Sequence, residues 1–183
     1  SGFYKNLDKI TILKEKGKLM NFVSIIMGSK SDYEIMTNCS KILEEFGVAY
    51  ELIISSAHRS PQRTKDYIKQ AEEKGAKVFI AAAGMAAHLA GAIAASTTKP
   101  VIGVPMKGGA MDGMDAMLST VQMPAGMPVA TVALGKAGAL NAAYLAMQIL
   151  AITDNELAVK MTEDRVVKEH KVVNDSKEIE VLL

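Results

Sequence analysis

The stretch FVSIIMGSKSD, residues 22–32, decides the fold. Its first part, Phe22–Met27, is a short run that is almost entirely apolar, which is typical of a strand buried on both faces of a parallel sheet. A glycine and small polar residues follow and lead into residues 31–46, whose apolar side chains recur with helical spacing. A buried strand, a glycine-containing loop and an amphipathic helix in this order predict the first unit of an α/β fold.

The same unit recurs along the rest of the chain. Further strands are predicted at 49–55, 78–83, 101–104 and 129–134, and further helices at 60–75, 86–95, 112–121 and 137–151. This alternation predicts a flavodoxin-like α/β sandwich of three layers, with a five-stranded parallel sheet in the order 2-1-3-4-5. In that order the loops after strands 1, 2 and 3 meet at the carboxyl edge of the sheet, where ligands bind in such folds.

Helix ends have recognisable signals. Capping boxes are predicted at Ser31–Glu34 and at Thr153–Glu156, and the second one opens a charged C-terminal helix that runs to about His170. Ser60 before Pro61 predicts the start of the helix that follows strand 2.

Length and composition indicate one globular domain. The chain has 183 residues, of which 49% are hydrophobic and 22% charged, and its net charge is +1. So small a charge argues against nucleic-acid and anionic-membrane partners, and no apolar run reaches the roughly 18 residues of a transmembrane helix. The single cysteine, Cys39, indicates a reducing compartment, which we take to be the cytoplasm. Cys39 falls on the apolar stripe of the first helix and is expected in the core.

Met20 immediately precedes the first strand. We therefore expect residues 20–183 to form a single catalytic domain, with its C-terminal helix from about residue 154, and residues 1–19 to be an N-terminal extension or an appended segment. A genuine N-terminal helix at 1–19 is an equally good interpretation.

Alanine, glycine and methionine dominate residues 81–151. Small residues allow close packing either within one subunit or between subunits. Because the predicted helices at 86–95 and 143–149 offer little polar surface to water, we favour a homo-oligomer.

The loop after strand 1, Gly28–Asp32, has features of a phosphate or ribose site. It enters a helix N-terminus, whose free N–H groups and positive dipole end favour anions. Ser29 and Ser31 can donate hydroxyl hydrogen bonds, whereas Asp32 would repel phosphate but can bind a ribose hydroxyl. Plain helix capping is the alternative explanation, above all for Ser31.

The loop after strand 2, Ser55–Pro61, carries a His-Arg pair. Arg59 offers a planar cationic fork for phosphate or carboxylate. His58 can give or take a proton near neutral pH. A packed, structural histidine is the alternative.

The loop after strand 3 runs from Ala83 to Leu89. Gly84 permits the close approach of backbone to a ligand. His88 is expected about one turn into the following helix, where it either lines a site or is packed as a structural residue.

Several other activities lack their motifs. The sequence has no G-x-G-x-x-G, no P-loop and no G-x-S-x-G elbow. His58, His88 and His170 lie far apart with no close cysteine or histidine partner, so no zinc site is expected. Strands 1 and 3 do not end in acidic residues, which excludes a phospho-acceptor domain of this fold.

Four motifs together resemble the class I N5-carboxyaminoimidazole ribonucleotide mutases of bacteria. They are Gly28–Asp32, Ser56–Pro61, Ala86–Leu89 and Gln122–Val129, within a resemblance that runs from about residue 22 to 151. It implies an octamer of flavodoxin-like subunits that acts in purine biosynthesis without a metal or an organic cofactor. The implied reaction converts N5-carboxyaminoimidazole ribonucleotide to 4-carboxyaminoimidazole ribonucleotide by loss, caging and re-addition of carbon dioxide.

The resemblance also implies the roles of individual residues. His58 would be the acid and base of the reaction. Ser29, Asp32 and Arg59 would contact the ribose and phosphate, and His88 would line the pocket around the base and the transferred carboxyl. The other substrate-binding residues that it implies are Ser31, Ser56, Ala57, Gly84, Met85, Ala86 and Leu89.

Two stretches depart from the family pattern and bear on the fine shape of the pocket. Residues 89–92, Leu-Ala-Gly-Ala, replace a proline and a Gly-Met pair, and Ala125 is often larger or a glycine. His88, which the related direct carboxylases lack, favours the mutase. The alternatives are a direct aminoimidazole ribonucleotide carboxylase that uses carbon dioxide, a non-catalytic nucleotide-binding module and a purely structural oligomer.

Overall fold

The structure, a computed structural model, describes residues 21–181, so the predicted extension at residues 1–19 lies outside the described residues. Along them, strands and helices alternate as predicted. The strands are β1 (Phe22–Met27), β2 (Tyr50–Ile54), β3 (Ala76–Gly84), β4 (Val101–Met106) and β5 (Ala130–Thr131). The helices are the 3₁₀ helix η2 (Lys30–Asp32), α1 (Tyr33–Glu45), α2 (Pro61–Lys74), α3 (Leu89–Ala94), α4 (Met114–Val121), α5 (Gly135–Ala151) and α6 (Asn155–Ile179).

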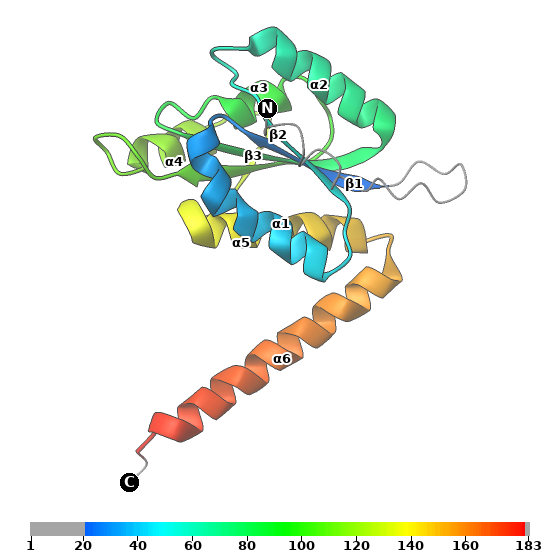
Figure 1. Cartoon of the computed structure of the whole chain (residues 1–183), viewed down its shortest axis with the longest axis vertical. Coiled ribbons are helices and arrows are strands. Elements are labelled where there is room, and N and C mark those ends of the chain that lie inside the picture. Colours follow the sequence, from blue (N-terminus) through cyan, green and yellow to red (C-terminus); the bar gives the residue numbers. More distant parts are fainter. Residues whose placement is uncertain (1–20, 182–183) are drawn as a thin grey trace, which may run out of the picture. The chain divides into compact units, whose positions relative to one another are not determined.

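The strands form one parallel sheet in the order β2-β1-β3-β4-β5, which confirms the predicted topology (Figure 1). All six residues of β1 are buried, as its apolar sequence predicts. At the end of β1, Met27 pairs with Ile54 of β2 and with Ala82 of β3. The three loops that follow these strands therefore leave the sheet side by side.

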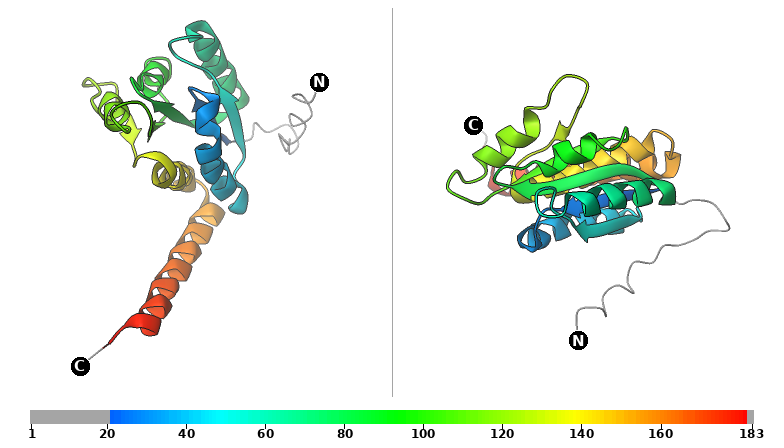
Figure 2. Two further views of the ribbon diagram at one scale, coloured as in Figure 1. Left: turned by 60° about the vertical axis from the view of Figure 1, so that its left-hand side comes forward. Right: turned by 90° about the horizontal axis from the view of Figure 1, so that it is seen from above.

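Helices cover both faces of the sheet. Figure 1 shows α2 and α3 on one side and α1 and α5 on the other, and the left view of Figure 2 keeps this division. The core on the α2 and α3 side includes Phe22, Ile68, Phe79 and Ile93. Cys39 of α1 is fully buried, which confirms it as a core residue, and burial raises the pKa of its thiol to about 12.

A buried carboxylate is neutralised and hydrogen-bonded between β2 and α2. Glu51 is 8% exposed and accepts hydrogen bonds from Lys74 Nζ at 2.9 Å and from the Tyr67 hydroxyl at 3.1 Å. The Tyr67 oxygen also lies 2.9 Å from Ser24 Oγ of β1, and because Tyr67 gives its one hydrogen to Glu51, Ser24 is the donor there. Burial and the nearby Glu51 raise the pKa of Tyr67, so the hydroxyl keeps its hydrogen. The network ties α2 to β1 and β2.

Two helix starts beside the loops differ from the sequence prediction. The capping box Ser31–Glu34 is wrong, because η2 precedes α1 and Ser29 caps it by accepting a hydrogen bond from the Ser31 N–H. Helix α3 begins at Leu89 instead of residue 86. Met85 has a left-handed backbone (φ 54°), and the N–H groups of Ala87 and His88 donate two residues back, to Met85 O at 2.8 Å and Ala86 O at 2.7 Å, instead of four residues back as in an α-helix. His88 therefore lies at the N-terminal end of α3 and not one turn inside it.

Two other elements also differ in length. β5 pairs over two residues only, although 129–134 was predicted: the chain leaves the ladder before α5 begins at Gly135, with one last bond from Val132 N–H to Gly103 O at 3.0 Å. Helix α6 is capped by Asp154, whose Oδ1 accepts from Leu157 N–H at 3.0 Å, so the predicted box at Thr153 is wrong. The helix also continues to Ile179, past the predicted end near His170.

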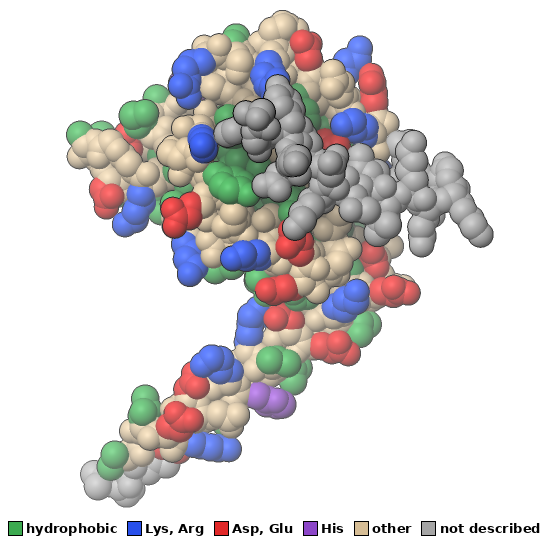
Figure 3. Space-filling view, in the orientation of Figure 1, with side chains coloured by type: hydrophobic (Ala, Val, Ile, Leu, Met, Phe, Trp, Pro, Cys, Tyr) green, Lys and Arg blue, Asp and Glu red, His purple; other side chains and the backbone are tan. Residues whose placement is uncertain are grey.

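The chain divides into two compact units within α5, one ending at Ala146 and the other beginning at Met147. The single domain expected for residues 20–183 stays a prediction. On α6, basic and acidic side chains are mixed along the helix (Figure 3), and Lys171 pairs with Asp175 one turn away at 2.6 Å. Within residues 21–181, no helix has both the length and the apolar character needed to cross a membrane.

Candidate active site

Three loops meet at the carboxyl edge of the sheet, as the strand order predicted. We name them the first loop (residues 28–32), the second loop (55–60) and the third loop (84–88). Backbone hydrogen bonds join them where the strands end: Ser55 N–H donates to Met27 O, and Gly28 N–H donates to Ala82 O, both at 2.9 Å. The first loop thus lies between the other two.

The first loop is built on hydroxyl groups and a buried acid. Ser31 N–H donates to Ser29 Oγ at 3.3 Å, and the Ser31 hydroxyl lies 3.0 Å from Ser29 Oγ and 3.3 Å from Asp32 Oδ1. Since that hydroxyl has one hydrogen, it satisfies one of these acceptors at a time. Asp32 is 8% exposed, and its burial raises the pKa of the carboxyl, although hydrogen bonds from Ser31 and from the Ser29 backbone partly offset this. A carboxylate has about four lone-pair sites, so Asp32 can accept more hydrogen bonds than the one from the Ser31 hydroxyl.

The second loop is stabilised by hydrogen bonds of its own serines and exposes the side chains of His58 and Arg59. Ser56 N–H donates to Ser60 Oγ at 3.1 Å, the Ser60 hydroxyl donates to Ser56 O at 3.0 Å, and Arg59 N–H donates to Ser56 Oγ at 3.2 Å. His58 and Arg59 are exposed at its tip. The Arg59 guanidinium donates from Nη2 to Gly28 O at 3.3 Å, which places a permanent cation beside the first loop.

The third loop brings His88 next to His58, so the expectation that the three histidines lie far apart is wrong for this pair. The ring centroids of His58 and His88 lie 5.4 Å apart, with an angle of 33° between the ring planes. Gly84 lies so close to β4 that an added Cβ would come within 3.4 Å of Met106 O. Met85, which follows, is 62% exposed. Two imidazoles and a guanidinium thus come from neighbouring loops at one edge of the sheet.

Most of the predicted site residues belong to these loops, but two have side chains in or against the core. Leu89 is 2% exposed, and Ala57 packs against the core between the sheet and helices α2 and α3. A ligand contact from either would come from the backbone, and their assignment as substrate-binding residues stays a prediction. The predicted residues on the loops are Ser29, Ser31, Asp32, Ser56, His58, Arg59, Gly84, Met85, Ala86 and His88.

Two hydroxyl groups beside the second loop were missed from the sequence. Ser55 Oγ and Thr64 Oγ1 lie 2.8 Å apart, and both residues are 2% exposed. The sequence does contain a signal, because Thr64 shares the buried face of α2 with Ile68 and Ala71, where an apolar residue is the ordinary choice.

A metal centre has no obvious protein ligands here. In the part of the chain that the structure describes, no three His, Cys, Asp or Glu side chains are grouped so that they could hold a metal ion.

Fold and loops together define a class: a flavodoxin-like α/β protein that has an imidazole pair and an exposed guanidinium at the carboxyl edge of its sheet. The family within this class follows from comparison with known sequences. The chain belongs to the AIR carboxylase family, whose model matches residues 22–171.

Curated relatives and solved structures agree with this assignment. An N5-carboxyaminoimidazole ribonucleotide mutase of Bacillus subtilis is 52% identical over 157 residues, which cover 86% of this chain and 97% of the relative. Proteins of the same name from Pyrococcus horikoshii and Thermotoga maritima are 52% and 49% identical over 86% of this chain, and 88% and 91% of their own lengths. A crystal structure of Treponema denticola PurE superposes with a TM-score of 0.80 at 26% identity, covering 88% of this chain and 99% of that one.

Proposed function

We propose that this protein is an N5-carboxyaminoimidazole ribonucleotide mutase, which moves the carboxyl group of its substrate from the exocyclic nitrogen to a ring carbon in purine biosynthesis. The observation that carries the proposal is the shared position of His58, Arg59 and the Ser29 turn, in a chain about half identical to curated mutases. The reaction is an isomerisation of one substrate. It therefore needs a group that carries a proton and a site that keeps the carbon dioxide, and it needs no second substrate.

The substrate would be anchored by its phosphate and ribose. The Arg59 guanidinium can form paired hydrogen bonds with phosphate oxygens, and the Ser29 turn at the start of η2 adds hydroxyl and N–H donors. The Asp32 carboxylate would accept a hydrogen bond from a ribose hydroxyl. This placement directs the base and its carbamate toward His58 and His88.

His58 would carry out both proton transfers. As the carbamate C–N bond breaks, its electron pair stays on the exocyclic nitrogen, which takes a proton from the His58 imidazolium, and carbon dioxide is released. The ring carbon then attacks the confined carbon dioxide and forms a C–C bond, and neutral His58 removes the proton from that carbon. The imidazolium is restored, and nothing is oxidised or reduced. Acid–base catalysis of this kind is worth about 10²–10⁴-fold.

Confinement of carbon dioxide would supply much of the remaining rate. A carbon dioxide molecule held next to the ring carbon replaces a bimolecular encounter, and effective molarities for such proximity reach about 10⁵ M or more. The three loops at the carboxyl edge are the parts of the chain that would enclose it.

The proposal extends to a homo-octamer located in the cytoplasm, both implied by the family resemblance. An apolar stripe on α4 supports self-association, because Met114, Leu118 and Val121 occupy one face of the helix and are 47%, 46% and 49% exposed. Contiguous apolar side chains of this kind mark contact surfaces more often than scattered ones do.

Substrate assays distinguish this function from its alternatives. We expect the ultraviolet absorbance of N5-carboxyaminoimidazole ribonucleotide to change on addition of the protein, without added bicarbonate. Faster turnover of aminoimidazole ribonucleotide plus bicarbonate would instead identify a direct carboxylase. Binding of both nucleotides with turnover of neither would identify a nucleotide-binding module.

A further inference from the structure

We propose that Thr64 is a positioning residue for the reaction: its buried hydroxyl, anchored on Ser55, holds the second loop in the conformation that presents His58. The inference rests on the proposed function, because it assigns Thr64 a role through the acid–base residue. Thr64 itself is 2% exposed and lies on α2, so it acts without touching the substrate.

The hydrogen bonds around Thr64 run in one direction. Thr64 Oγ1 donates to Ser60 O at 3.2 Å. A threonine hydroxyl has a single hydrogen, so the 2.8 Å contact with Ser55 Oγ must be donated by Ser55. The chain Ser55 to Thr64 to Ser60 thus connects the first residue of the second loop, whose N–H is held to the sheet by Met27 O at 2.9 Å, to the last residue of that loop.

This connection matters because the other side-chain bonds of the loop are internal or distant. The bonds between Ser56 and Ser60 close the loop upon itself and do not attach it to the sheet. The Arg59 guanidinium attaches its tip to Gly28 O, at 3.3 Å and in an exposed setting. The buried link through Thr64 is the shielded attachment, and shielding from water strengthens a hydrogen bond.

Among residues 21–181, no hydrogen bond or ion pair holds the His58 imidazole in the way the Thr64 hydroxyl is held. Its imidazole is exposed, and its contact with another ring is with His88, which is exposed as well. The backbone conformation of residues 56–60 therefore determines the position of the imidazole. A change in the buried link would move His58 without removing any group that binds or reacts.

Three variants separate these roles. Thr64→Val keeps the shape of the side chain and the backbone N–H that donates to Ser60 O at 3.1 Å, but it removes the hydroxyl donor to Ser60 O and leaves the buried Ser55 hydroxyl without its acceptor. Thr64→Ser keeps the hydroxyl and should restore function. Ser55→Ala removes only the anchor and should have an intermediate effect.

A matched control lies on another helix. Thr120 of α4 is also 2% exposed and donates to the carbonyl four residues earlier, Ala116 O, at 2.7 Å. Thr120→Val therefore removes the same kind of buried bond away from the second loop.

The first readout is the split between kcat and KM with N5-carboxyaminoimidazole ribonucleotide. In Thr64→Val we expect kcat to fall about 10- to 100-fold, because a displacement of 1 Å in a catalytic group can cost about 10²-fold. KM should change much less, since Arg59 keeps its separate bond to Gly28 O. Thr64→Ser and Thr120→Val should retain the kcat of the wild type.

The second readout is the rate at which diethyl pyrocarbonate modifies each histidine, mapped by mass spectrometry. The chain has three histidines, so His170 serves as an internal reference. We expect Thr64→Val to change the rate at His58 and not at His170. The quantity compared is the ratio of the modification rate at His58 to that at His170, which we call the His58 modification ratio. A merely structural role of Thr64 would lower the melting temperature and leave this ratio as it is in the wild type.

The outcomes leave a clear decision. Any of three results would overturn the positioning role. They are a wild-type kcat in Thr64→Val, an unchanged His58 modification ratio in Thr64→Val, and a fall in kcat in Thr64→Ser as large as in Thr64→Val. If Thr64→Val does not fold, Ser55→Ala decides by the same two readouts. A wild-type protein that fails to turn over the substrate would refute the proposed function instead, and the His58 modification ratio alone would then decide on positioning.

Discussion

At the scale of single residues, the buried carboxyl of Asp32 is expected to lower folding stability while it serves the proposed substrate binding. Its carboxyl is buried at the first loop, and burial raises its pKa above the ordinary value of 3.8. A folded-state pKa above the unfolded value means that ionisation opposes folding at neutral pH. This cost shrinks as the pH falls through the raised folded-state pKa and is gone below 3.8, where the folded and unfolded chains both hold the proton.

Asp32→Asn is therefore expected to raise the melting temperature at neutral pH and to weaken substrate binding, because the amide removes the buried charge and one acceptor. The gain in stability should shrink as the pH is lowered, which thermal melts over a pH series would measure. Asp66→Asn, at an exposed site on α2, serves as the control and should give no such gain. A lower melting temperature for Asp32→Asn at neutral pH would show that the carboxylate stabilises the fold.

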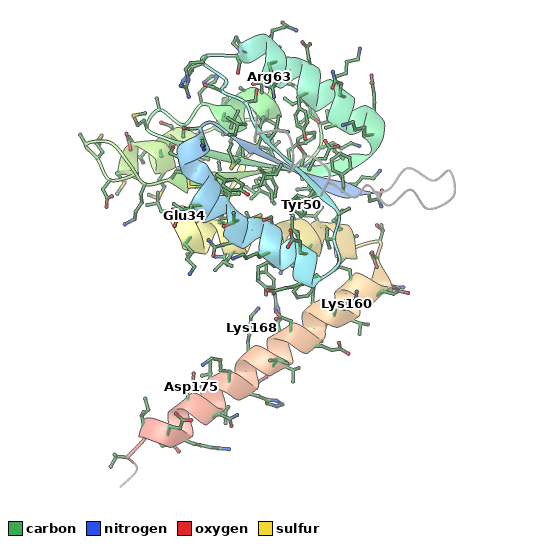
Figure 4. All side chains as sticks on the ribbon, viewed as in Figure 1. Glu34, Tyr50, Arg63, Lys160, Lys168 and Asp175 are labelled. Carbon is green, nitrogen blue, oxygen red and sulfur yellow. The ribbon has the colours of Figure 1, made fainter. Side chains whose placement is uncertain are left out.

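In the proposed function, Arg59 anchors the phosphate of the nucleotide. Hydrogen bonds to charged groups are worth about 1.5–3 kcal/mol, so Arg59→Ala should raise KM about 10- to 100-fold. Arg63, exposed one turn further along α2 and labelled in Figure 4, provides a control of the same chemistry. Equal KM values for Arg59→Ala and Arg63→Ala in steady-state kinetics would contradict a phosphate-binding role for Arg59.

At the scale of elements, the attachment of α2 to the sheet determines where the second loop begins. The network of Tyr67, Glu51, Lys74 and Ser24 ties the body of the helix to β1 and β2. It lies away from the carboxyl ends of these strands, so it contributes to stability without touching the site.

Tyr67→Phe tests this separation. Removing the hydroxyl leaves the fully buried Ser24 without its acceptor, and an unsatisfied buried group costs about 1–3 kcal/mol. We expect a loss of that size in the free energy of unfolding, measured with urea, and an unchanged kcat. The Tyr50 hydroxyl donates to the exposed Glu44 at 2.5 Å, so Tyr50→Phe should lose less free energy of unfolding. A larger loss for Tyr50→Phe would mean that the buried network is not the stabilising one.

The sequence predicted the order of the elements but not all of their ends. Apolar runs that predict buried strands and helical periodicity are local patterns in the sequence. β1 shows the first pattern and α2 the second. The late start of α3 depends on the turn at residues 85–88, where Met85 takes a left-handed backbone that is uncommon for any residue but glycine and the next N–H groups bond two residues back. The short β5 depends on where the chain turns away from β4 to enter α5, which no local pattern records.

The same distinction holds for the candidate site. That the three loops converge follows from strand order alone, and so His58, Arg59 and the Ser29 turn could be grouped from the sequence. Hydrogen-bond partners could not be predicted, because they depend on how α2 packs against β2. The pairing of Ser55 with Thr64 is the clearest case.

At the scale of the whole molecule, the apolar stripe of α4 predicts assembly. We expect sedimentation equilibrium to give eight times the mass of one chain. Leu118→Asp, in the stripe, should dissociate the assembly, whereas Ser119→Asp, the exposed residue beside it, should not. A wild-type monomer would contradict both the octamer and the role of the stripe.

Substrate binding and turnover of His58→Asn, measured on one preparation, test the proton-transfer role most directly. Asparagine keeps a polar side chain at the tip of the second loop but cannot exchange a proton near neutral pH. We predict that titration calorimetry will show near wild-type affinity for the ribonucleotide, while kcat falls by about 10²–10⁴-fold or more. Turnover close to the wild-type rate would contradict the assignment of His58 as the acid and base.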